Sequence, residues 1–135
     1  MASLFDLGDI PVGLIPGTMS LAEPTATATL SAANSYNVLI RGVPTAAATY
    51  TTATAAAILT ALGSDATVGT TFQAVVINAS AGANTITFAG GSGVTVSGVA
   101  TVAQNASKVF IGRVTDVTTP AITYYGLGSV AAAAA

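Results

Sequence analysis

The chain has 135 residues, of which 52% are hydrophobic and only 6% are charged, with a formal net charge of −2. This length favours one domain, and an ordinary soluble domain carries roughly 25% charged residues. Three basic residues are too few for the electrostatic footprint of a nucleic-acid-binding protein, and the lack of cysteine excludes disulfides and thiolate metal sites. Since so few charges leave a sticky surface, we expect other subunits to cover much of it.

The hydrophobic composition does not predict a membrane protein. Residues 66–107 are free of charge, but Thr, Ser, Asn, Gln and Gly interrupt them throughout. A membrane helix needs about 20 mostly apolar residues in a row. The start, MASLFDLGDI, is acidic and lacks the basic region of a secretory signal. We therefore expect neither a membrane partner nor a secretory signal.

Residues 1–23 differ from the rest of the chain. Large apolar side chains are mixed with prolines and glycines, which break any long helix. An apolar, irregular segment must lie against something, and two alternatives stay open: it folds back on its own domain, or it is an arm that docks on a neighbour. For the arm, the expected partner-binding residues are Leu4, Phe5, Leu7, Ile10, Val12, Leu14 and Ile15.

From residue 24 onward the composition turns to Ala, Thr, Gly and Val, and short strands are predicted. The first strands are expected at 26–32, 36–41 and 47–51. The segment 52–63 is rich in alanine and leucine, which favour helix. It predicts one short helix, with Thr51 or Thr52 as its N-cap and Gly63 at its C-cap.

The second half of the chain predicts strands to its end. They are expected at 71–78, 84–88, 93–98, 99–102, 107–115 and 121–127. The first of these is apolar on both faces, as a central strand is. Between two of them, GGSG at 90–93 predicts a tight hairpin in which glycine supplies a positive φ.

Short strands spaced by about ten residues predict a mainly all-β fold. The expected domain is a β-sandwich or jelly-roll-like domain at 24–130 with one short helix. An irregular N-terminal arm at 1–23 precedes it, and an alanine tail at 131–135 follows it.

The sequence offers little for catalysis. Histidine is absent, and acid–base chemistry usually needs a histidine or tuned carboxylates. The glycine-rich stretch at 90–93 lacks the lysine and the following helix of a phosphate loop. Asp6 and Asp9 could face a cation together, but two carboxylates make a poor site without further oxygen ligands. We expect no enzyme, no cofactor and no metal.

The few charged and polar aromatic side chains allow two interpretations each. Lys108 and Arg113 lie on one predicted strand and Arg41 ends another. They either protect edge strands from pairing, which we favour, or meet acidic groups of a partner. Tyr124 and Tyr125 point to opposite faces of one strand, so at least one belongs to the core and the other could contact a sugar.

Residues 49–128 carry a pattern that resembles the β-rich modules of tailed-phage virion proteins, such as capsid decoration (cement) proteins, head fibres and tail-fibre segments. The residues that carry the resemblance are Phe72, Asn78, Ser80, Thr85, Ile86, Thr87, Gly91, Gly93, Val94, Thr95 and Gly98. The resemblance implies a structural, non-enzymatic role. It also implies a homo-oligomer, often a trimer, that is seated on a capsid lattice through an N-terminal arm or basal loops.

The first functional hypothesis is therefore a trimeric decoration protein on the exterior of a phage capsid. It would stabilise the shell by binding the major capsid protein across subunit junctions, where many modest contacts add up. The alternative is a short head-fibre or tail-fibre module that binds a host glycan. A less favoured third hypothesis is an extracellular structural module.

Overall fold

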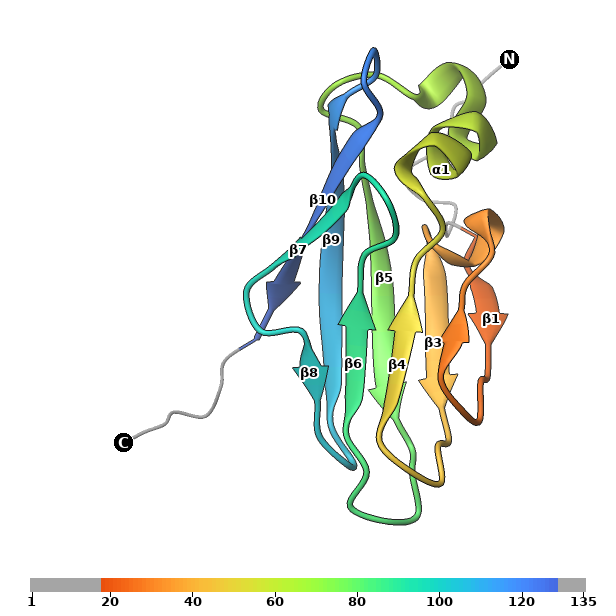
Figure 1. The fold of residues 1–135 in the computed structure, drawn as a ribbon, viewed down its shortest axis with the longest axis vertical. Helices are drawn as coiled ribbons and strands as arrows, with labels where there is room; N and C mark the ends of the chain where they lie inside the picture. The colour runs from red at the N-terminus through yellow and green to blue at the C-terminus, as the bar shows by residue number, and fades with distance from the viewer. Residues whose placement is uncertain (1–17, 129–135) are drawn as a thin grey trace, which may run out of the picture.

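The computed structural model describes residues 18–128, which form two facing β-sheets with a short helix at one end (Figure 1). One sheet has six strands in the order β1-β3-β5-β9-β10-β7, and the other has four in the order β2-β4-β6-β8. The strands are β1 (Ser20–Ala22), β2 (Ala28–Thr29), β3 (Val38–Gly42), β4 (Ala48–Thr51), β5 (Thr71–Asn78), β6 (Ile86–Ala89), β7 (Val94–Ser97), β8 (Thr101–Val102), β9 (Ser107–Asp116) and β10 (Ala121–Leu127). The helix is α1 (Ala55–Leu62), and two 3₁₀ turns, η2 (Ala32–Asn34) and η3 (Gly63–Asp65), complete the elements.

From β1 to β8 each strand lies in the opposite sheet from the strand before it. Each connection therefore crosses between the sheets, and strands two apart in sequence become neighbours, except that β7 pairs with β10 and not with β5. This is why β3 pairs parallel with β5 and β4 pairs parallel with β6. Successive strands share a sheet in β9 and β10, which pair antiparallel around the turn at 117–120. The prediction of a β-sandwich-like, mainly all-β fold with one short helix is confirmed.

The predicted hairpin at 90–93 is wrong, because the strands on its two sides belong to different sheets. β6 pairs with β4 and β8, whereas β7 pairs parallel with β10 at an edge of the larger sheet. The glycines instead allow the chain to pass from β6 in one sheet to β7 in the other. Gly93 has a φ of 79°, and a Cβ at Gly91 would lie 2.6 Å from the carbonyl oxygen of Thr52. The positive φ was expected correctly, but it turns the chain from one sheet to the other.

The core lies between the two sheets and is closed by aromatic rings from both. Phe88 of β6 stacks on Phe110 of β9 with 4.5 Å between ring centroids. Tyr124 of β10 meets Phe88 and Phe72 edge-on at 5.2 and 5.7 Å. Such pairs add about 0.5–1.5 kcal/mol each beyond the area that they bury. The rings therefore join β5, β9 and β10 of the larger sheet to β6 of the smaller one.

Helix α1 covers one end of the sandwich, and it begins later than the sequence suggests. Its N-cap is Thr54, whose hydroxyl accepts a hydrogen bond from the Ala57 amide at 3.1 Å. Thr52, one of the two expected caps, is buried and accepts from the Gly91 amide at 3.0 Å. The expected C-cap is confirmed, since Gly63 follows the helix with a φ of 63°.

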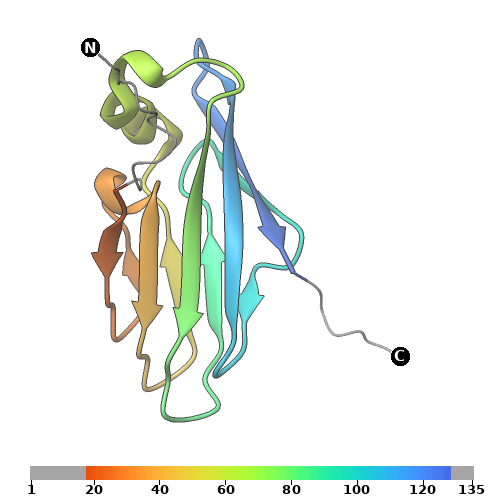
Figure 2. The same cartoon turned by 180° about the vertical axis from the view of Figure 1, so that it is seen from behind.

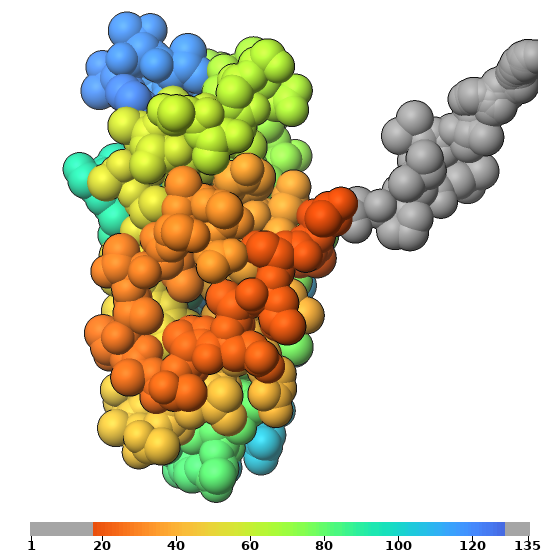
Figure 3. Space-filling view, turned by 90° about the vertical axis from the view of Figure 1, so that its right-hand side faces the viewer, coloured from red at the N-terminus to blue at the C-terminus, as the bar shows by residue number. Residues whose placement is uncertain are grey.

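The edge strand β1 lies within residues 1–23, which were predicted to form the arm. Residues 20–22 of β1 pair parallel with Val38–Ile40 of β3. Figure 3 shows residues 18–45 spread over this edge of the sandwich. The domain therefore includes β1, and the boundary expected at residue 23 lies inside it. Among the described residues, no helix is long and apolar enough to cross a membrane.

Candidate functional site

The outer faces of the two sheets differ in chemistry. On the four-stranded sheet, the outward positions are threonines that pair across strands: Thr29 with Thr51, and Thr49 with Thr87, which in turn faces Thr101. Threonine suits a pleated surface that contacts water, because its methyl group packs sideways while its hydroxyl is hydrated.

The outer face of the six-stranded sheet carries an unbroken line of aliphatic side chains across five strands. Leu21, Leu39, Val75, Val109 and Leu127 are register partners from β1 through β3, β5 and β9 to β10. We call these five residues the aliphatic row. Leu21 and Leu127, at its two ends, are 59% and 50% exposed, and the three residues between them are half-buried. Figure 2 views this sheet from outside.

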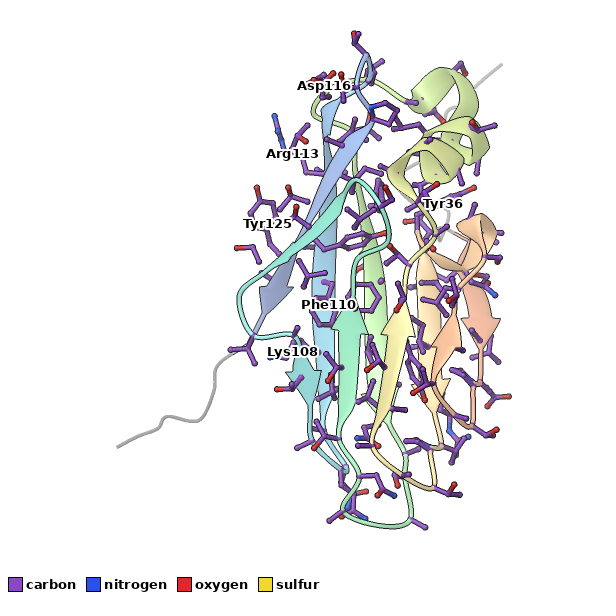
Figure 4. The ribbon with its side chains drawn as sticks, in the orientation of Figure 1. Tyr36, Lys108, Phe110, Arg113, Asp116 and Tyr125 are labelled. Carbon is purple, nitrogen blue, oxygen red and sulfur yellow. The ribbon has the colours of Figure 1, made fainter. Side chains whose placement is uncertain are left out.

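Two further apolar side chains lie beside the aliphatic row. Ile111 of β9 pairs with Tyr125 of β10, which is 43% exposed, and on its other side with the polar Gln73 of β5. Arg41 and Arg113 are the exposed cations of this face. Figure 4 shows Arg113 and Tyr125 directed away from the interior that Phe110 occupies. The face therefore combines an apolar centre with the cation of Arg113 toward one end and the ion pair of Arg41 and Glu23 toward the other.

Two open hollows lie toward opposite ends of this face. One, of about 290 Å³, is lined partly by Ile77 and Ser107, which point outward at one end. The other, of about 230 Å³, is lined partly by Thr71, Gln73 and Ile111 toward the other end. The surface between them can therefore accept protruding side chains of a partner at either end.

The edge-strand interpretation of the basic residues is wrong. Lys108 and Arg113 lie on β9, which has neighbours on both sides, and Arg41 lies on β3, between β1 and β5. Lys108 points inward and is 9% exposed. Arg41 forms an exposed ion pair of 3.3 Å with Glu23, and such a pair contributes about 0–1 kcal/mol.

Asp116 caps the turn between β9 and β10. Its carboxylate accepts hydrogen bonds from the amides of Thr118 and Thr119 at 2.8 and 3.1 Å. This contact gives the carboxylate a structural role in holding the turn.

The two neighbouring tyrosines point to opposite faces, as expected. Tyr124 is buried, and its hydroxyl donates to the Ser35 carbonyl. Burial raises the pKa of Tyr124 above its ordinary value of 10.0. Tyr125 lies on the outer face, where its ring is available to a partner.

Within residues 18–128, no group of three or more His, Cys, Asp or Glu lies together in a way that could hold a metal ion. Glu23 pairs with Arg41, and Asp116 caps a turn. The candidate site that we consider further is the outer face of the six-stranded sheet.

The aliphatic row is not among the site residues predicted from the sequence, although the sequence contains strands with apolar residues on both faces. The strand at 71–78 was recognised as apolar on both faces, and KVFIG on β9 has the same property. When both odd and even positions of a strand are apolar, one set points into the core and the other points outward. The sequence does not show the strand order, and it is the strand order that brings these outward residues into one line.

The seven expected partner-binding residues, Leu4, Phe5, Leu7, Ile10, Val12, Leu14 and Ile15, lie outside the described residues, as does the alanine tail. Comparisons of the chain with models of protein families, with curated proteins and with solved structures found no match.

Proposed function

We propose that this protein is a structural component of a phage virion, a homo-oligomeric decoration protein that stabilises the capsid from outside by binding across its subunits. The observation that supports this best is the aliphatic row, which lies on the surface of the described residues 18–128 in a chain in which only 6% of residues are charged. Large exposed apolar patches mark protein contact sites. A protein that works in many copies on a shell supplies the partners that such a surface needs.

The contacts of such a protein would be many and individually modest. Multivalent attachment raises the overall affinity without any single strong site, which agrees with a described surface that has shallow hollows and few charges. The N-terminal residues 4–15 would join the outer face in making these contacts, with the major capsid protein or with a neighbouring copy as their partner.

Co-sedimentation with purified heads of the encoding phage tests this function. The informative pair of variants is Val75→Glu on the aliphatic row and Thr87→Glu on the threonine face, since both add one negative charge to an outward strand position. We expect the unaltered chain and Thr87→Glu to sediment with heads and Val75→Glu to stay in solution. If the unaltered chain itself does not bind heads, the decoration function is wrong.

A glycan-binding fibre module is the second candidate, and one observation favours it. Tyr125 presents an exposed ring beside Ile111 on the outer face, and aromatic rings stack on sugars. A glycan array probed with the purified oligomer tests it, with Tyr125→Ala as the matched variant. Binding that Tyr125→Ala abolishes would favour this candidate, whereas an array without signal would count against it.

A further inference from the structure

The aliphatic row is the largest unexplained feature of the described surface. Its five side chains come from five strands and form one line, so a single elongated partner could cover all of them. Covering apolar surface is favourable roughly in proportion to the area that is removed from water. A partner that covers the whole row would therefore gain more than one that covers a single side chain.

The chain itself supplies a segment that begins beside the row. The described residues start two positions before β1, and Leu21 of β1 is the first member of the row. Residues 1–17 precede this point. Fully extended, 17 residues reach roughly 56–61 Å, whereas a six-stranded sheet is about 24 Å wide. The segment is long enough to reach across the face of a neighbouring copy.

The composition of the segment matches the face. Its charged residues, Asp6 and Asp9, are both acidic. On the face, Arg41 is paired with Glu23, whereas Arg113 forms no ion pair within the described residues. Seven large apolar residues lie between positions 4 and 15. The segment therefore offers apolar side chains for the row and negative charge for Arg113.

The distribution of apolar side chains in residues 4–15 bears on whether the segment folds back on its own sheet or contacts a second copy. In an extended segment, Leu4, Ile10, Val12 and Leu14 point to one side and Phe5, Leu7 and Ile15 to the other. A segment laid on one sheet alone would bury one of these sets and expose the other. A segment held between the surfaces of two copies would bury both sets, so the pattern favours a contact that involves a second copy.

We propose that the outer face of the six-stranded sheet binds residues 4–15 of a second copy of this chain. The receptor surface is the aliphatic row with Ile111 and Tyr125 beside it, and Arg113 attracts the acidic residues of the incoming segment. The contact forms between free copies of the chain and does not depend on the presence of a capsid. Its test is therefore separate from the test of capsid binding.

Photo-cross-linking from the face identifies the occupant directly. Tyr125 is replaced by p-benzoylphenylalanine, an exchange of one exposed aromatic ring for another in the full chain. Val117, an exposed residue in the turn after β9, receives the same group as a control. After irradiation, denaturing electrophoresis separates cross-links between chains from those within a chain, and mass spectrometry locates the linked residue.

We expect position 125 to give covalent dimers linked to residues 4–15, and position 117 to give none. A link to residues 4–15 within the same chain would overturn the proposal in favour of a segment that folds back. Dimers linked through the partner's sheet would overturn it in favour of packing face to face. No cross-link from position 125 would show that the face is unoccupied, which also overturns it.

Native mass by light scattering supplies an independent readout in the full chain. Val75→Glu places a charge in the centre of the row, and Thr87→Glu places one at an outward position of the four-stranded sheet, away from the proposed surface. We expect Val75→Glu to reduce the oligomer to monomer while Thr87→Glu keeps its mass. Circular dichroism confirms that each variant is folded. A folded Val75→Glu with unchanged mass would contradict the proposal.

Discussion

Asn78 joins three backbone segments at the end of the sandwich opposite the helix. Its side-chain amide donates to the carbonyls of Asn84 and Val102 at 2.7 and 2.9 Å, and its oxygen accepts from the Ser80 amide at 3.0 Å. The residue is 1% exposed. It therefore ties the end of β5 in one sheet to the strand β8 in the other.

Replacing Asn78 with alanine should leave buried backbone groups without partners. Each unsatisfied buried group costs about 1–3 kcal/mol, so we expect a loss of at least that size in the free energy of unfolding. Urea denaturation of Asn78→Ala measures it. Gln73→Ala, which removes an exposed amide from the same strand, should change stability little. Equal effects of the two substitutions would contradict the role assigned to Asn78.

Two tyrosine hydroxyls make the stability sensitive to alkaline pH. Burial raises the pKa of Tyr124 and of Tyr50, whereas an unfolded tyrosine ionises near pH 10. Above that pH the unfolded state loses protons that the folded state keeps, so the stability that is present below about pH 10 falls as the pH rises.

The free energy of unfolding at pH 8 and pH 11 tests this linkage. We expect a clear loss for the unaltered chain and a smaller loss for Tyr124→Phe, in which Tyr50 alone contributes. Tyr124→Phe also lacks the bond to the Ser35 carbonyl, so it should be less stable at pH 8. The same pH slope in both chains would refute the assignment.

At the level of single elements, strand β9 depends on a residue without a side chain. A Cβ at Gly112 would lie 2.3 Å from the ring of Phe72 on the neighbouring strand β5. Overpacking of a filled core costs typically about 1–3 kcal/mol. We expect Gly112→Ala to destabilise the protein by about that amount in thermal or urea unfolding. Ser107→Ala, at an exposed position of β9, is the control, and its effect should be small.

Helix α1 offers a second element-scale prediction through its N-cap. Removing a threonine cap costs typically about 1 kcal/mol, so Thr54→Ala should lower the free energy of unfolding by about 1 kcal/mol. Thr54→Ser keeps the capping oxygen and should stay close to the unaltered chain. The comparison shows whether the hydroxyl, rather than the side chain's bulk, sets the start of the helix. A Thr54→Ser variant as unstable as Thr54→Ala would point to bulk.

For the whole molecule, two truncations separate the N-terminal segment from the domain. Removing residues 1–17 leaves β1 in place, so the domain should stay folded and lose only the stability that the contact between copies adds. Removing residues 1–23 deletes β1, opens the edge of β3 and removes the partner of Arg41. Open strand edges promote aggregation. We expect the longer truncation to melt lower and to aggregate in light scattering. Similar behaviour of both chains would show that β1 is dispensable.

Much of the secondary structure could be predicted from local patterns. The strands at 71–78, 107–115 and 121–127 match β5, β9 and β10 to within a residue or so, because alternating β-branched and aromatic residues bounded by turns are a strong local signal. The helix was expected for an equally local reason, its alanine and leucine content. The predicted start of the helix was too early, because Thr51, Thr52 and Thr54 are equally suitable as caps in the sequence. In the structure the Thr52 hydroxyl accepts from the distant Gly91 amide and is therefore not the cap.

The candidate surface could not be predicted in the same way. The segment 84–98 has turn residues between two alternating strands, and such a pattern fits both a hairpin and a crossing between sheets. The sequence by itself determined that the chain is a mainly β protein with one short helix, because strand alternation and helix propensity are properties of neighbouring residues. Only the tertiary structure decided which strands pair, because register partners such as Leu39 and Val75 are far apart in the chain. That pairing turns separate outward side chains into one apolar face.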